Sequence, residues 1–161
     1  MLDVVFRPES WFLEEGRACL SDEFGKDYGT YFSILSLIAR GRTKRSEIEQ
    51  VLGGDLGAYI KNLVEDYELV KRRQPLFDKP KSRNISLRIE DNFFAFWFRF
   101  IAHYHYMLEI GANEKLKEVV KRDRSRIDLE AVHGKFLAFV ASTGKFKRTK
   151  SQLMALSLED M

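Results

Sequence analysis

The sequence has only one cysteine, no long apolar run and no leader in which basic residues precede an apolar stretch. Cys19 has no second thiol with which to form a disulfide bond, so a reducing cytoplasm is the expected compartment. No apolar run reaches the roughly 18 residues that span a bilayer, and Arg99 interrupts the most apolar stretch. The first residues do not form the pattern of a secretory signal. These absences argue against a membrane protein and against a secreted, disulfide-rich one.

The composition is that of a globular protein, with 45% apolar and 32% charged residues in a chain of 161. A chain of this length forms one domain or two small ones. The net charge is only +3, but the charges are unevenly spread: residues 1–27 hold three basic and seven acidic side chains. Residues 71–88 hold seven basic side chains against Asp78 alone. This asymmetry says more about binding partners than the net charge does.

The most apolar stretch lies between residues 91 and 101 and contains six phenylalanine or tryptophan residues. At about 100° per residue these rings point to almost every side of a helix, which is typical of a helix covered on several sides. We therefore expect a central helix over residues 91–108, with Asp91 or Asn92 as its N-cap. Arg99 inside it must reach water or a carboxylate, because an unpaired buried charge is too costly.

Four segments before this stretch show helical spacing of apolar residues. The first covers residues 9–24, and the second carries Tyr31, Ile34, Leu35 and Ile38 before Gly41. Two short helices follow, for which Thr43 and Asp55 are the expected caps. The first carries Ile48, Val51 and Leu52 and is closed by Gly53 and Gly54. In the second, the side chains expected to face inward are Leu56, Tyr59, Ile60, Leu63 and Val64.

Two short strands are predicted next, at residues 69–73 and 84–89. In the second, Ile85, Leu87 and Ile89 alternate with polar residues. Three helices and a hairpin form the order of a winged helix-turn-helix. The predicted fold is mainly α with a small β-hairpin, a winged helix-turn-helix packed on a helical carboxy-terminal unit.

The expected organisation has three parts, namely a helical lead-in over residues 1–27, the winged helix over 28–90 and the helical unit over 91–161. Beyond the central helix, residues 113–122 form a charged helix with Leu116, Val119 and Val120 inward. Residues 129–140 form a further helix. The tail after residue 144 has too weak a periodicity to assign.

Six segments of the sequence are informative when taken together: residues 29–39, 45–48, 82–84, 88–93, 96–101 and the terminal 156–161. They resemble the carboxy-terminal half of a family of predicted AAA-type ATPases that is widespread in archaea. In that family a nucleotide-binding domain precedes a winged helix and a restriction-endonuclease-like domain, the domain of unknown function 234. The resemblance is nearly continuous over residues 1–121, and residues 1–24 resemble the last helices of the ATPase lid.

The chain departs from this family in two respects. No Gly-x-x-x-x-Gly-Lys-[Ser/Thr] loop is present to cradle nucleotide phosphates. A nuclease core of this type needs a Glu-x-Lys strand, whereas Glu118 and Lys121 have one residue too many between them and lie in a predicted helix. We therefore expect no enzyme, and we hypothesise that most of the nuclease-like domain is missing between about residues 122 and 126.

The candidate DNA contacts are basic and polar side chains of the winged helix. The third short helix should enter the major groove, although Glu65 and Asp66 on it would repel phosphates. The start of the preceding helix and the wing supply phosphate contacts. The predicted site residues are Thr43, Lys44, Arg45, Lys61, Asn62, Arg72, Arg73, Lys79, Lys81 and Arg83.

Neither a metal nor a cofactor is expected. His103 and His105 would lie about 200° apart on a helix and cannot share an ion, and His133 is remote in sequence. Cys19 lies on an apolar face and is interpreted as a packed thiol. The favoured function is a non-catalytic module that binds double-stranded DNA, a fragment or remnant of an AAA-type ATPase. The alternative is a protein-interaction or regulatory module that docks an ATPase domain or associates with itself.

Overall fold

The computed structural model describes residue 6, residues 11–74 and residues 84–123. Its elements in chain order are α2 (Trp11–Phe24), the 3₁₀ turn η1 (Gly25–Asp27), α3 (Tyr28–Ala39), α4 (Arg45–Leu52), α5 (Gly57–Glu65), β1 (Val70–Arg73), β2 (Ser86–Ile89), α6 (Asn92–Phe96), the π-helical η2 (Trp97–Ala102), α7 (His105–Glu109) and α8 (Asn113–Asp123). Over these residues the chain is mainly α with a small β-hairpin, which confirms the predicted fold class. The predicted helix over residues 129–140 lies outside the described residues. Among the described helices, none combines the length and the apolar character needed to cross a bilayer.

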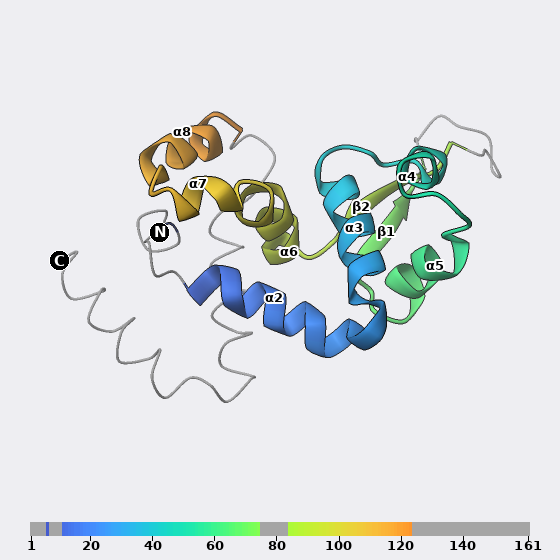
Figure 1. Ribbon diagram of the computed structural model, residues 1–161. Helices are drawn as coiled ribbons and strands as arrows, with labels where there is room; N and C mark the ends of the chain where they lie inside the picture. Colours follow the sequence, from blue (N-terminus) through green and yellow to red (C-terminus); the bar gives the residue numbers. More distant parts are fainter. Residues whose placement is uncertain (1–5, 7–10, 75–83, 124–161) are drawn as a thin grey trace.

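Two groups of elements lie side by side, and α2 runs along both (Figure 1). Helices α3, α4 and α5 surround the hairpin in the order expected for a winged helix-turn-helix, while α6, η2, α7 and α8 form the second group. Helix α2 contacts α3 at one end and η2 further along its length. Leu20 and Phe24 on α2 are buried, whereas Cys19 is only half-buried.

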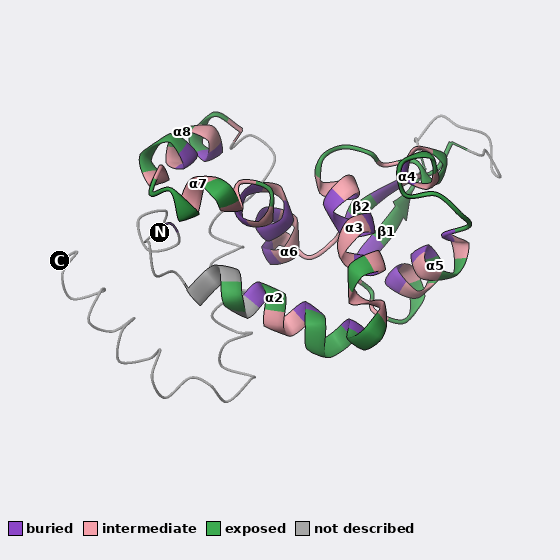
Figure 2. Ribbon diagram, in the orientation of Figure 1, coloured by how far each residue is buried: buried purple, intermediate pink, exposed green. Residues whose placement is uncertain are grey.

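Helix α3 supplies the centre of the winged-helix core (Figure 2). Tyr31, Ile34, Leu35 and Ile38 are all buried, so the side chains predicted from the i, i+3, i+4, i+7 spacing are confirmed. The Tyr31 ring packs against the ring of Phe24 at a centroid distance of 4.5 Å. Burial of each such side chain stabilises the fold by about 1.5–3 kcal/mol.

The hairpin is antiparallel, with Val70 opposite Ile89 and Arg73 opposite Ser86. Leu87 and Ile89 are buried as the alternation predicts, but Ile85 precedes β2 and is 40% exposed, so its predicted inward position is wrong. The amide N–H of Leu87 donates to the carbonyl of Thr43 at 2.7 Å. The segment before α4 therefore pairs with β2 on the side away from β1.

Helix α4 differs from its prediction at its start. Lys44, and not Thr43, occupies the N-cap position, and its amide N–H donates to Glu47 Oε2 at 3.3 Å. Ile48 is fully buried, whereas Val51 and Leu52 are 54% and 37% exposed. Periodicity identifies which residues share a helical face, but it does not show how far the core extends along a helix of two turns.

Helix α5 follows its prediction closely. Leu56, Ile60 and Leu63 are buried, and Tyr59 and Val64 pack against the core while half-buried. Asp55 Oδ1 accepts from the amide N–H of Gly57 at 2.7 Å, as expected of a capping carboxylate, although Leu56 occupies the N-cap position itself.

The predicted single helix over residues 91–108 is divided in the structure. Asp91 caps α6, accepting from the amide N–H of Phe94 at 3.1 Å, which confirms the predicted N-cap. The chain then follows the π-helical η2, turns at residues 103–104 and continues as α7. Hydrogen bonds in a π-helix join residues five positions apart, whereas those in an α-helix join residues four apart. The aromatic side chains along η2 therefore point in different directions from those that an α-helix would give them. The side chains buried along α6 and η2 are Phe93, Phe96, Trp97, Phe98, Phe100 and Ile101.

Helix α8 confirms the prediction for the charged helix, because Leu116 and Val120 are buried and Val119 is half-buried. It also supplies the carboxylate that Arg99 was predicted to need. Arg99 Nε and NH2 donate to Asp123 Oδ2 at 2.7 and 2.5 Å, and its NH1 donates to the carbonyl of Ala39 at 3.4 Å. One guanidinium thus joins η2, α8 and the end of α3.

Replacing Arg99 with methionine is expected to lower the free energy of unfolding by about 1 kcal/mol. The loss is modest because the side chains of Arg99 and Asp123 remain 29% and 36% exposed. Urea denaturation of Arg99→Met, Asp123→Asn and the double variant forms a cycle that isolates the pair. Strictly additive effects of the two substitutions would contradict a direct interaction.

Candidate nucleic-acid interface

Three of the predicted contact residues, Lys44, Arg45 and Arg72, line a groove between α4, the start of α5 and the inner face of the hairpin. The groove has a volume of about 740 Å³, and both polar and apolar side chains line it. Its lining residues are Lys44, Arg45, Ser46, Glu49, Gly57, Ile60, Arg72, Ile85 and Leu87. We call it the α4–hairpin groove. Lys44 and Arg72 are distant in sequence, yet both line this groove.

Lys44 and Arg72 are the cations of this groove whose charge is not compensated. Both are exposed, and neither forms an ion pair with any residue that the structure describes. Lys44 stands at the N-cap of α4, where the first amide groups of a helix favour an anion. Arg72 lies on the same face of the hairpin as its partner Leu87, because directly opposed residues of an antiparallel pair share a face.

Arg45 lies in the groove as predicted, but carboxylates on either side hold it. Its Nε donates to Glu49 Oε1 at 2.6 Å and its NH2 donates to Asp55 Oδ1 at 2.7 Å. The hydrogen bond to Glu49 raises the pKa of Arg45 above its usual value. Two carboxylates therefore compensate the charge of Arg45, which leaves it less able to attract a phosphate than Lys44 or Arg72.

The face of α5 offers less to DNA than its sequence suggested. Asn62, a predicted contact residue, is half-buried, and its Nδ2 donates to the hydroxyl of Tyr31 at 3.0 Å. This hydrogen bond to α3, 31 residues earlier, engages part of the amide within the fold. Lys61 is exposed and lies 3.7 Å from Glu65 Oε2, so the one basic side chain of this helix faces an acidic neighbour.

The hairpin holds the remaining predicted cations. Arg73 is exposed on the outer face, opposite to Arg72, and Lys79, Lys81 and Arg83 lie outside the described residues. Arg88 was not among the predicted site residues, yet it is exposed on the outer face of β2. The alternation that placed Leu87 and Ile89 inward was a sufficient signal to place Arg88 outward.

The histidines stand away from this groove. His105 Nδ1 lies 3.2 Å from Glu109 Oε1, and the exposed His103 ring stacks edge-on against Tyr104. Partial burial, together with Arg40, lowers the pKa of His103. Within the described residues, no three histidine, cysteine, aspartate or glutamate side chains are grouped as a metal site would require. His133 lies outside those residues.

Comparison with known proteins gives one relative and no family. No family model matches the chain, and no solved structure matches it. An uncharacterized protein of Methanocaldococcus jannaschii is 43% identical to it over 75 residues. That similarity covers 45% of this chain and only 17% of the archaeal protein. The matched segment is therefore similar to a small part of a much longer protein.

Proposed function

We propose that the protein is a non-catalytic, cytoplasmic module that binds double-stranded DNA through the α4–hairpin groove. The observation that carries the proposal is the convergence of Lys44 and Arg72 on one groove, from elements 28 positions apart in the numbering. Arg73 and Arg88 add positive charge on the other face of the same hairpin. Lysine and arginine side chains that neutralise phosphates supply most of the sequence-independent affinity for a duplex.

This geometry favours contact with the DNA backbone over reading of base edges. Phosphate contacts position a protein on the duplex, while specificity requires side chains that reach the bases in the grooves. On α5, the amide of Asn62 donates to the hydroxyl of Tyr31, and Lys61 lies beside Glu65. Fewer side chains of this helix are therefore available for contacts with bases. We therefore expect weak sequence preference and strong dependence on salt.

The decisive test measures duplex binding as a function of salt. Replacing both Lys44 and Arg72 with alanine should weaken binding at about 50 mM salt by about 10- to 100-fold and lower the slope of log K against log salt by about 2. Fluorescence anisotropy of a labelled duplex between about 50 and 200 mM salt gives both quantities.

The matched control removes the same charge elsewhere. Lys115 and Arg122 are exposed on α8, away from the groove, so the Lys115→Ala/Arg122→Ala variant should bind the duplex almost as the unaltered protein does. Equal losses in the two double variants would show general attraction to a basic surface and would refute the groove as the binding site.

We also propose that the chain is a fragment or remnant of an AAA-type ATPase. The resemblance of its segments to the carboxy-terminal half of that family supports this origin. The archaeal relative is much longer than the segment it shares with this chain, as expected if such a segment forms part of a larger protein. The residues from the family's nucleotide and nuclease motifs that would make it an enzyme are not in the sequence.

The second candidate function is protein docking, either to an ATPase domain or to another copy of the chain. It is favoured by apolar side chains that are exposed near the groove, Val51, Leu52 and Ile85 at 54%, 37% and 40%. Light scattering separates the two functions: self-association that is lost in Val51→Ser/Leu52→Ser favours docking. A monomer with salt-dependent duplex binding favours DNA.

A further inference from the structure

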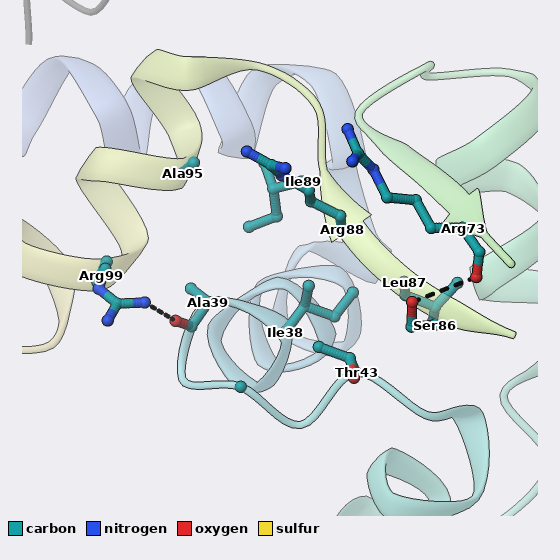
Figure 3. Close-up of a pocket in the computed structure, with 11 residues that line it drawn as sticks. Ile38, Ala39, Thr43, Arg73, Ser86, Leu87, Arg88, Ile89, Ala95 and Arg99 are labelled. Atoms are coloured by element: carbon teal, nitrogen blue, oxygen red, sulfur yellow. Dashed lines mark hydrogen bonds between the residues drawn. The ribbon is translucent and has the colours of Figure 1, made fainter. Parts of the chain in front are cut away.

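A second hollow lies along the edge of β2 that faces away from β1, beside the end of α3 and the start of η2 (Figure 3). Its volume is about 570 Å³, within the range of small-molecule sites. Arg73, Arg88 and Arg99 line it, together with apolar side chains such as Ile38 and Ala95. None of the described residues that line it is acidic. We call it the edge hollow.

Arg73 and Arg88 are the cations that a ligand in this hollow would meet. They lie on the same face of neighbouring strands, and their side chains extend in the same direction in Figure 3. Both are exposed, and within the described part of the chain neither forms an ion pair. Two arginines on one face without a carboxylate between them form a natural anion site.

The rest of the outer face increases this excess of positive charge. Lys71 stands directly opposite Arg88, an arrangement of like charges that destabilises a hairpin. Lys71 turns to Glu90, with Nζ 2.7 Å from Oε1, and this hydrogen bond lowers the pKa of the Glu90 carboxyl. Glu90 is hydrogen-bonded to Lys71 alone, and the charges of Arg73 and Arg88 also lower the pKa of its carboxyl, so one carboxylate stands against three basic side chains. A bound anion would relieve the remaining repulsion.

A backbone donor points to the same place. The amide N–H of Glu90 donates toward β1, to the carbonyl of Leu69, while that of Leu87 donates the opposite way, to Thr43. N–H directions alternate along a strand. The amide N–H of Ile89 therefore points, like that of Leu87, toward the edge of β2 that faces away from β1. Ile89 lines the edge hollow, so its N–H is a donor at the hollow's wall.

Arg99 has a different role at this site. Its guanidinium already donates to Asp123 and to the carbonyl of Ala39 at the end of α3. The last carbonyls of a helix repel anions, and the contact with Arg99 compensates the carbonyl of Ala39, a residue that lines the hollow. Arg99 is therefore held in place as part of the lining of the hollow, and Arg73 and Arg88 are the arginines available to bind a ligand.

We propose that the edge hollow binds the phosphate group of a small phosphorylated ligand of nucleotide size. Arg73, Arg88 and the amide N–H of Ile89 hold the phosphate, while Ile38 and Ala95 contact the organic part. This site is separate from the duplex groove, because Arg72 faces the groove and the adjacent Arg73 faces the hollow.

Titration of the ¹⁵N-labelled protein with AMP and with inorganic pyrophosphate, at constant ionic strength, tests the proposal. The amide resonance of Ile89 is expected to shift and to saturate with each compound. Arg73→Gln and Arg88→Gln should each raise the Kd about tenfold, as expected for loss of one charge-assisted hydrogen bond. Arg122→Gln, the matched control on α8, removes an exposed arginine that lines neither the groove nor the hollow and should leave the Kd within about twofold.

Three results would overturn the proposal. The first is a titration of the unaltered protein in which Ile89 does not shift or does not saturate, which requires no variant to fold. The second is equal weakening by all three substitutions, which indicates a non-specific basic surface. The third is that a DNA duplex shifts the amide resonance of Ile89 and prevents AMP from binding. This result would show that the hollow binds a phosphate of the DNA backbone. Duplex binding is tested separately with the Lys44→Ala/Arg72→Ala variant. The proposal for the groove and the proposal for the hollow can therefore be refuted independently.

Discussion

Replacing Trp97 with alanine is expected to lower the free energy of unfolding by about 3–5 kcal/mol. Trp97 is 0% exposed, and it lies where η2 meets α2 and α3. Its ring packs edge-on against Phe32 of α3 at a centroid distance of 6.1 Å. Because a domain of this size is stable by only about 5–15 kcal/mol, the loss would remove a large share of its stability. Urea denaturation followed by circular dichroism measures it.

The partner of Trp97 on α2 is Gly16, and the contact makes a sharper prediction. A Cβ at position 16 would lie 2.2 Å from Trp97 Nε1 and 2.3 Å from Cε2, closer than real contacts allow. Gly16→Ala should therefore destabilise the protein by about 1–3 kcal/mol. In the Trp97→Ala background the same change should stabilise it by up to about 1 kcal/mol, since the clash is gone and alanine favours a helix.

Gly29 is the matched control, because it lies in α3 with nothing within 4 Å of an added Cβ. Gly29→Ala should stabilise the protein by about 0.5–1 kcal/mol in either background. The same sign for Gly16→Ala with and without Trp97 would contradict the packing of α2 against η2 described here.

Ile48→Ala is expected to cost about 2–5 kcal/mol, while Val51→Ala, three residues further along α4, should change stability by less than about 0.5 kcal/mol. The difference follows from burial, since Ile48 is fully buried and Val51 is 54% exposed. Both residues are β-branched and lie in the same helix, so helix propensity alone predicts similar effects. Thermal or urea unfolding of the two variants measures the contrast, and comparable losses would refute the register of α4.

Local sequence signals predicted most of the elements, because each depends on neighbours within one or two turns. The apolar spacing from Tyr31 to Ile38 and the alternation of Leu87 and Ile89 both identified buried faces. Asp91 was recognisable as a cap because a carboxylate there can reach an amide three residues later. The need of Arg99 for a carboxylate was also predictable, since it follows from the cost of an unpaired charge.

The sequence did not predict features that depend on residues distant along the chain. The half-buried Asn62 donates its amide to the hydroxyl of Tyr31, 31 residues earlier. Ile85 and Val51 are exposed because no other described element covers the positions they occupy. Burial depends on what packs against a face, and periodicity contains no information about that.

The candidate site shows the same division. The fold class, the hairpin and the basic character of residues 71–88 were predictable from the sequence, because composition and periodicity act locally along the chain. Which cations remain available depends on the tertiary structure. It compensates Arg45 with Glu49 and Asp55, and it directs Arg72 and Arg73 to opposite faces of one hairpin. The physical reason is that the effect of a charge depends on distances to groups that the fold alone brings together.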